Sequence, residues 1–294
     1  MMSVYMNRDD FLSIDAIRFG LNGLQKEIRF FVVLMVIVAV LYNLPSLIVN
    51  YFFKFQVLDD SLSSEVPEIL IPLAFASIII YLTVELGLLG IALKFRDNAA
   101  VGFKDLFRGY PLLLNYMAAT IIFSLMIMLP FLLLIAASAL LNRGTGEAII
   151  YILILLIILG AAAFLHLRYQ FFGYFIVDRG SGPIEALKQS ARMTKGVMKQ
   201  LLIFWAEMIL GIAFALAMVS IFIEIPVGLI LRLISEDLAP LAGGLVDSSI
   251  RLFIIVPLTK LATADIYRRL ELRVPRAAAG GPVGGVVGGG RVMV

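Results

Sequence analysis

The sequence predicts an all-α integral membrane protein whose six transmembrane helices form three hairpins, each preceded by an amphipathic cytoplasmic helix. Of the 294 residues, 61% are hydrophobic and only 15% are charged, and the mean hydropathy is +1.00. A soluble domain is typically about half apolar and about a quarter charged. The apolar residues also stand in stretches of roughly 20 or more, the length that a helix needs to cross a bilayer. Composition and the length of these stretches therefore indicate a polytopic membrane protein.

Six such stretches occur along the chain, each bounded by charged or turn-forming residues. Several are longer than a bilayer core is thick, which indicates tilt or extension beyond the lipid. Prolines toward the outer ends of the odd-numbered spans, Pro45, Pro130 and Pro226, are expected to kink or end those helices. The spans are predicted at Ile28–Tyr51, Pro67–Leu93, Pro111–Leu141, Ala148–Val177, Leu201–Leu233 and Ser249–Tyr267.

Basic residues predict the orientation of the spans. Most of the 24 Lys and Arg residues lie before the first predicted span or after the second, fourth and sixth. Because basic residues collect in cytoplasmic loops, both termini are expected in the cytoplasm. The chain then divides into an N-terminal amphipathic segment at 1–27, a transmembrane domain at 28–267 and a flexible, basic, Gly-rich tail at 268–294.

A short amphipathic segment precedes each odd-numbered span, which suggests a threefold internal repeat. The third segment is the clearest, because Pro183 suits the first turn of a helix and Glu185 suits the positive end of its dipole. One side of this helix is expected to carry Ile184, Leu187, Ala191, Thr194 and Met198. A helix that is apolar on one face and basic on the other lies among the headgroups of the inner leaflet. We therefore expect lipid contacts from the basic residues on the opposite face, Lys188, Arg192, Lys195 and Lys199.

Three stretches of the chain resemble a known group of proteins. The segment Phe175–Gly196 resembles the loop between spans four and five in a broad group of uncharacterised six-span prokaryotic membrane proteins. Gly102–Tyr110 looks like the segment before span three, and Pro257–Tyr267 is similar to the last span of that group. The group includes the membrane domain attached to some glycerophosphodiester phosphodiesterases. The resemblance implies a six-span fold in the prokaryotic inner, or cytoplasmic, membrane, and it implies no activity.

Ionisable side chains inside the predicted spans are the candidates for a polar intramembrane site. Burying such groups is costly unless they find partners or water, so their presence needs a reason. Glu85 and Glu207 are the best placed, and each could bind a cation or a proton. Each could instead pair with a base such as Lys260, Arg168 or His166. For both glutamates we favour structural pairing or a snorkelling position near a membrane interface.

Several chemistries are excluded by composition. A chain without cysteine forms no disulfide, thiolate nucleophile or iron–sulfur ligand set, and a single histidine excludes a His-rich metal site within one chain. We expect His166 to be a packing residue, although one axial histidine would suffice for a haem or chlorophyll. No hydrolase or nucleotide-binding motif occurs, so no cofactor is expected. Membrane topology explains the basic residues, and nucleic-acid binding has no support.

These observations favour a non-catalytic scaffold, accessory subunit or assembly factor of a membrane complex. Its expected partners are membrane lipids and either other membrane proteins or further copies of the chain. Small residues at four-residue spacing, such as Gly211 with Ala215, permit the close helix contacts that such assembly requires. Two alternatives stay open. The chain could be a transporter or channel that uses Glu85 and Glu207, or a lipid-modifying enzyme or a pigment carrier that uses His166.

Overall fold

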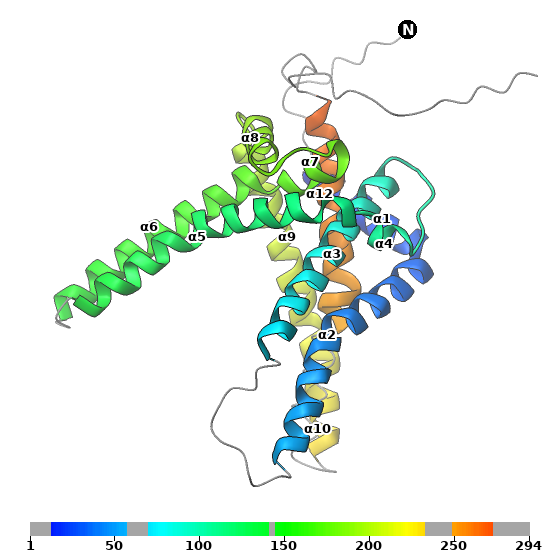
Figure 1. The fold of residues 1–294 in the computed structure, drawn as a ribbon, viewed down its shortest axis with the longest axis horizontal. Helices are drawn as coiled ribbons and strands as arrows, with labels where there is room; N and C mark the ends of the chain where they lie inside the picture. The colour runs from blue at the N-terminus through cyan, green and yellow to red at the C-terminus, as the bar shows by residue number, and fades with distance from the viewer. Residues whose placement is uncertain (1–12, 58–69, 141–144, 233–248, 273–294) are drawn as a thin grey trace, which may run out of the picture.

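The computed structural model describes residues 13–57, 70–140, 145–232 and 249–272, and every element in these ranges is a helix (Figure 1). The elements are α1 (Ser13–Lys26), α2 (Ile28–Val57), α3 (Leu70–Arg96), α4 (Asp105–Arg108), η1 (Tyr110–Leu112), α5 (Leu113–Leu140), α6 (Thr145–Tyr169), α7 (Phe172–Arg179), α8 (Pro183–Met193), α9 (Met198–Val219), η2 (Ser220–Glu224), α10 (Ile225–Arg232), η3 (Arg251–Ile255) and α12 (Val256–Glu271). The predicted tail at 268–294 lies outside the described residues except for its first five positions.

Five helical stretches within the described residues are long and apolar enough to cross a membrane, which indicates a multi-pass membrane protein. They overlap the first five predicted spans and lie at Ile28–Pro45, Ile71–Arg96, Asp105–Leu132, Ile152–Arg179 and Met198–Leu231. The sixth predicted span, Ser249–Tyr267, falls on η3 and α12 and is not among them. The α12 helix has only 16 residues, and it carries Lys260 and Asp265 in its middle. A sixth span is therefore not confirmed.

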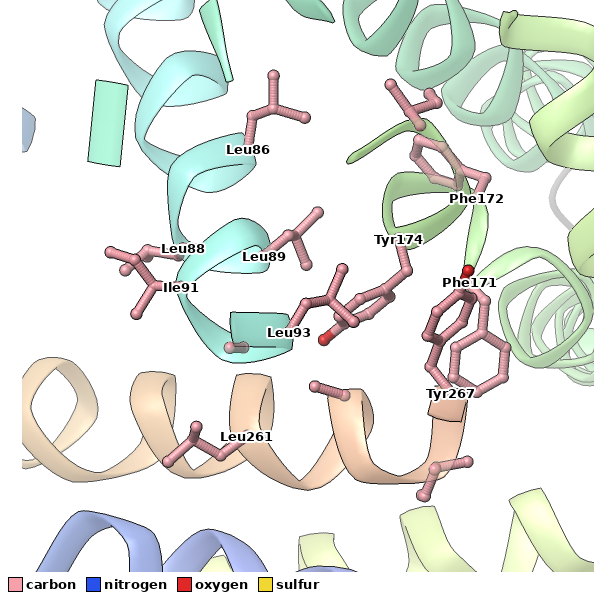
Figure 2. Packing of buried hydrophobic residues seen from close by; sticks show 14 of the residues in the cluster. Leu86, Leu88, Leu89, Ile91, Leu93, Phe171, Phe172, Tyr174, Leu261 and Tyr267 are labelled. Atoms are coloured by element: carbon pink, nitrogen blue, oxygen red, sulfur yellow. The ribbon is translucent and has the colours of Figure 1, made fainter. Parts of the chain in front are cut away.

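The α12 helix is buried by protein. It packs against α1 and α3, and its residues from Leu261 to Tyr267 are all buried. Figure 2 shows Leu89 and Leu93 of α3 pointing toward Tyr174 of α7, with Tyr267 of α12 beside that ring. The rings of Tyr174 and Tyr267 are stacked, with their centroids 5.3 Å apart. Apolar burial and aromatic stacking thus hold α12 between helices that are distant in sequence.

Burial is concentrated at one end of the molecule, which we call the packed end. It consists of α1, α7, α12, the second half of α3 and the first halves of α2 and α9. By contrast, most of the large apolar residues of α5 and α6 are exposed. These two helices pack on each other, and Figure 1 shows them diverging together from α2, α3 and α10. We call them the α5–α6 pair.

Prolines widen the helices at two places. The π-helical segments η2 and η3 each end two residues before a proline, Pro226 and Pro257 respectively. A proline has no N–H group, and its ring clashes with the carbonyl group four residues earlier. That carbonyl belongs to Phe222 in η2 and to Phe253 in η3, so the turn opens into a π-helix at that point. The helix continues past Pro226, and it also continues past Pro45 in α2 and Pro130 in α5, so these prolines end no helix.

Candidate functional site

An ion pair between α3 and α12 is the first candidate site. The ammonium group of Lys260 donates a hydrogen bond to Oε2 of Glu85. The hydroxyl group of Tyr42 on α2 lies 3.4 Å from Oε1 of the same carboxylate and donates to it. The side chains of Glu85 and Lys260 are only 14% and 24% exposed. The structure therefore joins three helices through one carboxylate.

Aromatic side chains surround this ion pair. The hydroxyl group of Tyr174 donates to the backbone oxygen of Lys260 at 3.0 Å. The ring of Tyr42 lies against the ring of Tyr81, with a centroid distance of 5.3 Å. In such surroundings an ion pair with satisfied hydrogen bonds is costly to break, because either charge alone would be left poorly solvated. The geometry suits a fixed structural link between α2, α3 and α12.

The other three predicted site residues lie on α6 and α9. His166 packs between aromatic rings, with centroid distances of 5.7 Å to Trp205 and 6.2 Å to Phe123. The guanidinium group of Arg168 lies 5.9 Å from the ring of Phe164. Glu207 is exposed on the surface of α9. Of the five candidates, the structure brings Glu85 and Lys260 into direct contact and places His166 and Arg168 on α6 and Glu207 on α9.

Arg268 is the centre of a second cluster, which the sequence analysis did not identify. Its guanidinium group donates two hydrogen bonds to Asp178 of α7, at 2.8 and 2.9 Å. It also donates to Asp97, directly after α3, at 2.6 and 3.0 Å and to Glu271 at 2.7 Å. Burial alone would lower the pKa of Arg268, but these hydrogen bonds raise it above its ordinary value. The hydroxyl group of Tyr267 donates to Asp178 as well, at 3.0 Å.

Further ion pairs extend this cluster across the packed end. Asp265 is 1% exposed, and Arg96 of α3 donates to it at 2.5 Å. Arg179 of α7 donates to Glu271 at 2.8 Å. Together with Arg268, these pairs connect α3, α7 and α12 through bidentate and charge-assisted hydrogen bonds, which are the strong ones in proteins. Their partners lie about 90 and 170 positions apart in sequence, and no local pattern in the sequence marks such pairs.

The backbone of α4 lies directly on α3. A Cβ atom on Gly87 would lie only 1.9 Å from the carbonyl oxygen of Leu106, so no larger residue fits there. Lys94 holds the start of α4 by donating to Asp105 at 2.5 Å. A cavity of about 340 Å³ beside this contact is lined by Lys94, Asp105 and Arg268 among others. Within the described residues, no three His, Cys, Asp or Glu side chains gather in a way that could hold a metal ion.

Hydroxyl groups attach α8 to the end of α6. Ser190 and Thr194 both donate to the backbone oxygen of Arg168, each at 3.1 Å. Ser190 also accepts a hydrogen bond from the backbone N–H of Phe171 at 3.2 Å. These contacts bury the hydroxyl groups together with Ala186, Leu187 and Met193. Of the residues predicted on the apolar side, Leu187 and Thr194 are buried and Ile184 is exposed. The basic residues predicted on the opposite face, Lys188, Arg192, Lys195 and Lys199, are all exposed.

Comparison with known proteins assigns neither a family nor a function to the chain. No protein family, curated protein or solved structure matches the chain. The resemblance to six-span prokaryotic membrane proteins consequently stays a prediction from the residues, and any function has to be argued from the geometry.

Proposed function

We propose that the chain is a non-catalytic scaffold or accessory subunit of a membrane complex, and that the α5–α6 pair binds the partner. We place it in the prokaryotic cytoplasmic membrane as six spans in three hairpins, with both termini in the cytoplasm, because basic residues border the predicted inner ends of the spans. The observation that supports this proposal most directly is the structural difference between the packed end and the α5–α6 pair. Polar contacts fix the packed end, whereas the pair stands apart with apolar, exposed faces.

The pairing of Glu85 inside the protein supports a structural role for this carboxylate and argues against a transport role. Glu85 is held by both Lys260 and Tyr42, and Lys260 belongs to the buried helix α12. A transport site must bind and release its ligand, whereas this arrangement neutralises the carboxylate inside the protein. Glu85, Lys260 and Tyr42 also hold α2, α3 and α12 together.

The α5–α6 pair supports a partner-binding role. Ile157 of α6 is 71% exposed, and a Cβ atom on Gly160 would meet nothing within 4 Å. The next three residues are alanines. Small side chains let a second helix approach closely, and packing is what selects a partner in the membrane because lipid tails are as apolar as leucine. Gly160 and its alanines therefore offer a surface for a helix of another protein.

Photo-crosslinking tests this proposal. A photoreactive residue at Ile157 is compared in native membranes with one at Phe222 of η2, because both side chains are 71% exposed. We expect Ile157 to crosslink to one defined membrane protein and Phe222 to crosslink to lipid only. Lipid adducts alone at both positions, or adducts between copies of the chain, would overturn the accessory role.

A transporter or channel is the second candidate, and the π-helical segments favour it. Such segments occur often at functional sites and mark helices that deform easily. If the chain is a transporter or channel, Glu85 and Glu207 would contact the solute. The test is flux in proteoliposomes, where the double variant Glu85→Gln/Glu207→Gln would lose transport of a solute that the unmodified chain carries. Unchanged flux would remove these glutamates from the site.

A further inference from the structure

A groove of about 530 Å³ lies between α5, α6 and α8. Its apolar surface comes from Ile122 and Met126 on α5 and from Ile184 and Leu187 on α8. Both α5 and α6 belong to helical stretches that are apolar enough to cross a membrane. The groove consequently has an apolar lining next to helices that lie among lipid chains.

Basic side chains give this groove a strongly positive rim. Arg168 of α6 and Lys188, Arg192 and Lys195 in or just after α8 all line it, and the lining includes no carboxylate among the described residues. Glu185, an exposed residue on α8, lies 3.9 Å from Arg192. A single weak ion pair leaves most of the positive charge available. Lys199, which was predicted with the others, does not line the groove.

One nitrogen of the groove residue Arg168 lacks a hydrogen-bond partner within the protein. Nε of Arg168 is buried, yet it donates to no other atom of the protein. A buried donor without an acceptor is costly, and charged donors are the most costly of all. A phosphate oxygen is a suitable acceptor for a guanidinium group, because both can form paired hydrogen bonds. Because Nε is closed off from solvent, a phosphate in the groove would pair with the outer N–H groups of the guanidinium group.

The rim is held in place before any ligand binds. Ser190 and Thr194 attach α8 to the backbone oxygen of Arg168 itself, and both side chains are fully buried. The backbone positions that carry Arg168 and the basic residues of α8 are thus fixed relative to one another. A preorganised site loses less entropy on binding than a flexible charged surface does.

We propose that this groove binds the phosphate group of an anionic phospholipid, with an acyl chain along Ile122 and Met126. The basic rim would hold the headgroup, and the outer N–H groups of Arg168 would donate to the phosphate. Basic pockets between transmembrane helices recognise anionic lipids in this way. The inference does not depend on the proposed scaffold role, because the groove lies at α8 and not at Gly160.

The test measures which lipids stay bound to the full chain. Protein from vesicles of phosphatidylcholine with a minor fraction of phosphatidylglycerol is extracted gently, and its lipids are identified by native mass spectrometry. We expect phosphatidylglycerol to be enriched about tenfold or more over its share in the vesicle, because each basic residue near a lipid surface favours anionic lipid by about fivefold. Added inorganic phosphate should not displace it, since the acyl chain contributes to binding. Displacement by phosphate would show that the groove binds free phosphate instead.

Charge-matched variants separate a built site from general attraction. The variant Lys188→Gln/Arg192→Gln/Lys195→Gln should lose the enrichment, whereas Arg18→Gln/Lys26→Gln/Arg29→Gln removes three exposed basic residues elsewhere and should keep it. Equal losses in the two variants would overturn the proposal. A second comparison leaves the basic residues intact: Ile184→Glu in the groove against Ile14→Glu on α1, both at exposed positions. Retained enrichment in Ile184→Glu would also contradict the site.

Discussion

The packed end includes the charged helices α1 and α12, whereas the α5–α6 pair is strongly apolar, and the two regions are held by different forces. At the packed end, Arg268 alone binds three carboxylates, and stacked tyrosines fill the space between α7 and α12. In the α5–α6 pair, large apolar side chains such as Ile157 point outward. Apolar packing inside a membrane is weakly specific, whereas charge-assisted hydrogen bonds fix both position and orientation. Polar contacts therefore fix the packed end, whereas the α5–α6 pair exposes its apolar side chains to lipid or to another protein.

The largest expected effect is the loss of Arg268. The variant Arg268→Gln leaves Asp97 and Asp178 without their main partner at the junction of α3, α7 and α12. We expect a loss of about 4 kcal/mol in the free energy of unfolding, measured by denaturant titration in detergent micelles, because breaking a mostly buried ion pair isolates its charges. The control is Arg108→Gln, whose side chain is 76% exposed, and its effect should stay below about 0.5 kcal/mol. Similar losses in both variants would show that charge alone, and not the cluster, stabilises this end.

The second largest effect is expected for the ion pair between Glu85 and Lys260. Glu85→Gln leaves the ammonium group of Lys260 poorly compensated, and a loss of about 3 kcal/mol is expected. The double variant Glu85→Gln/Lys260→Met removes both charges and should recover most of that stability. A double-mutant cycle on thermal and denaturant unfolding measures the coupling. Additive losses would mean that Glu85 and Lys260 act independently, and would reopen a transport role for Glu85.

The third effect is steric. Gly87→Ala forces a methyl group against the backbone of Leu106, and we expect α4 to shift with a cost of about 2 kcal/mol. At Gly90 an added Cβ would meet Val177 at an ordinary 3.6 Å. Gly90→Ala should therefore be neutral or slightly stabilising, since alanine is the better helix former. Hydrogen exchange of the α4 amides distinguishes the two variants, and equal protection in both would contradict the close contact.

The sequence predicted the helices far better than their partners. Hydropathy located five of the spans because a long apolar stretch is a local property, visible at Ile71–Arg96 without reference to any other segment. For α12, hydropathy gave no sign of the ionic contacts by which Asp265 and Arg268 bind residues of α3 and α7. Arg268 looked like one more basic residue at the inner end of a span. Its role depends on contacts with residues 90 and 171 positions away, which one sequence does not reveal.

The candidate site shows the same limit. Glu85 and Lys260 were identified as buried charges, because an ionisable residue in an apolar stretch is conspicuous. Lys260 was one of three bases predicted as possible partners of Glu85, and the structure selects it; the spacing of 175 positions could not distinguish it from Arg168 or His166. On α8, Thr194 was predicted on the apolar side and is buried. Ser190 was not predicted there, yet it is buried as well, because its hydroxyl group bonds to the backbone oxygen of Arg168. The periodicity of apolar residues gives no reason to bury a serine.

The most direct test of the account compares the unmodified chain with Gly160→Leu. This change adds bulk where the structure shows open space around a Cβ atom, so the thermal stability of the chain itself should not fall. Both proteins are extracted gently from native membranes and examined by native mass spectrometry. We predict a companion protein at fixed stoichiometry on the unmodified chain and its loss from Gly160→Leu. A chain that is isolated without any companion, or a companion that remains on Gly160→Leu, would contradict the claim that the α5–α6 pair is the docking surface.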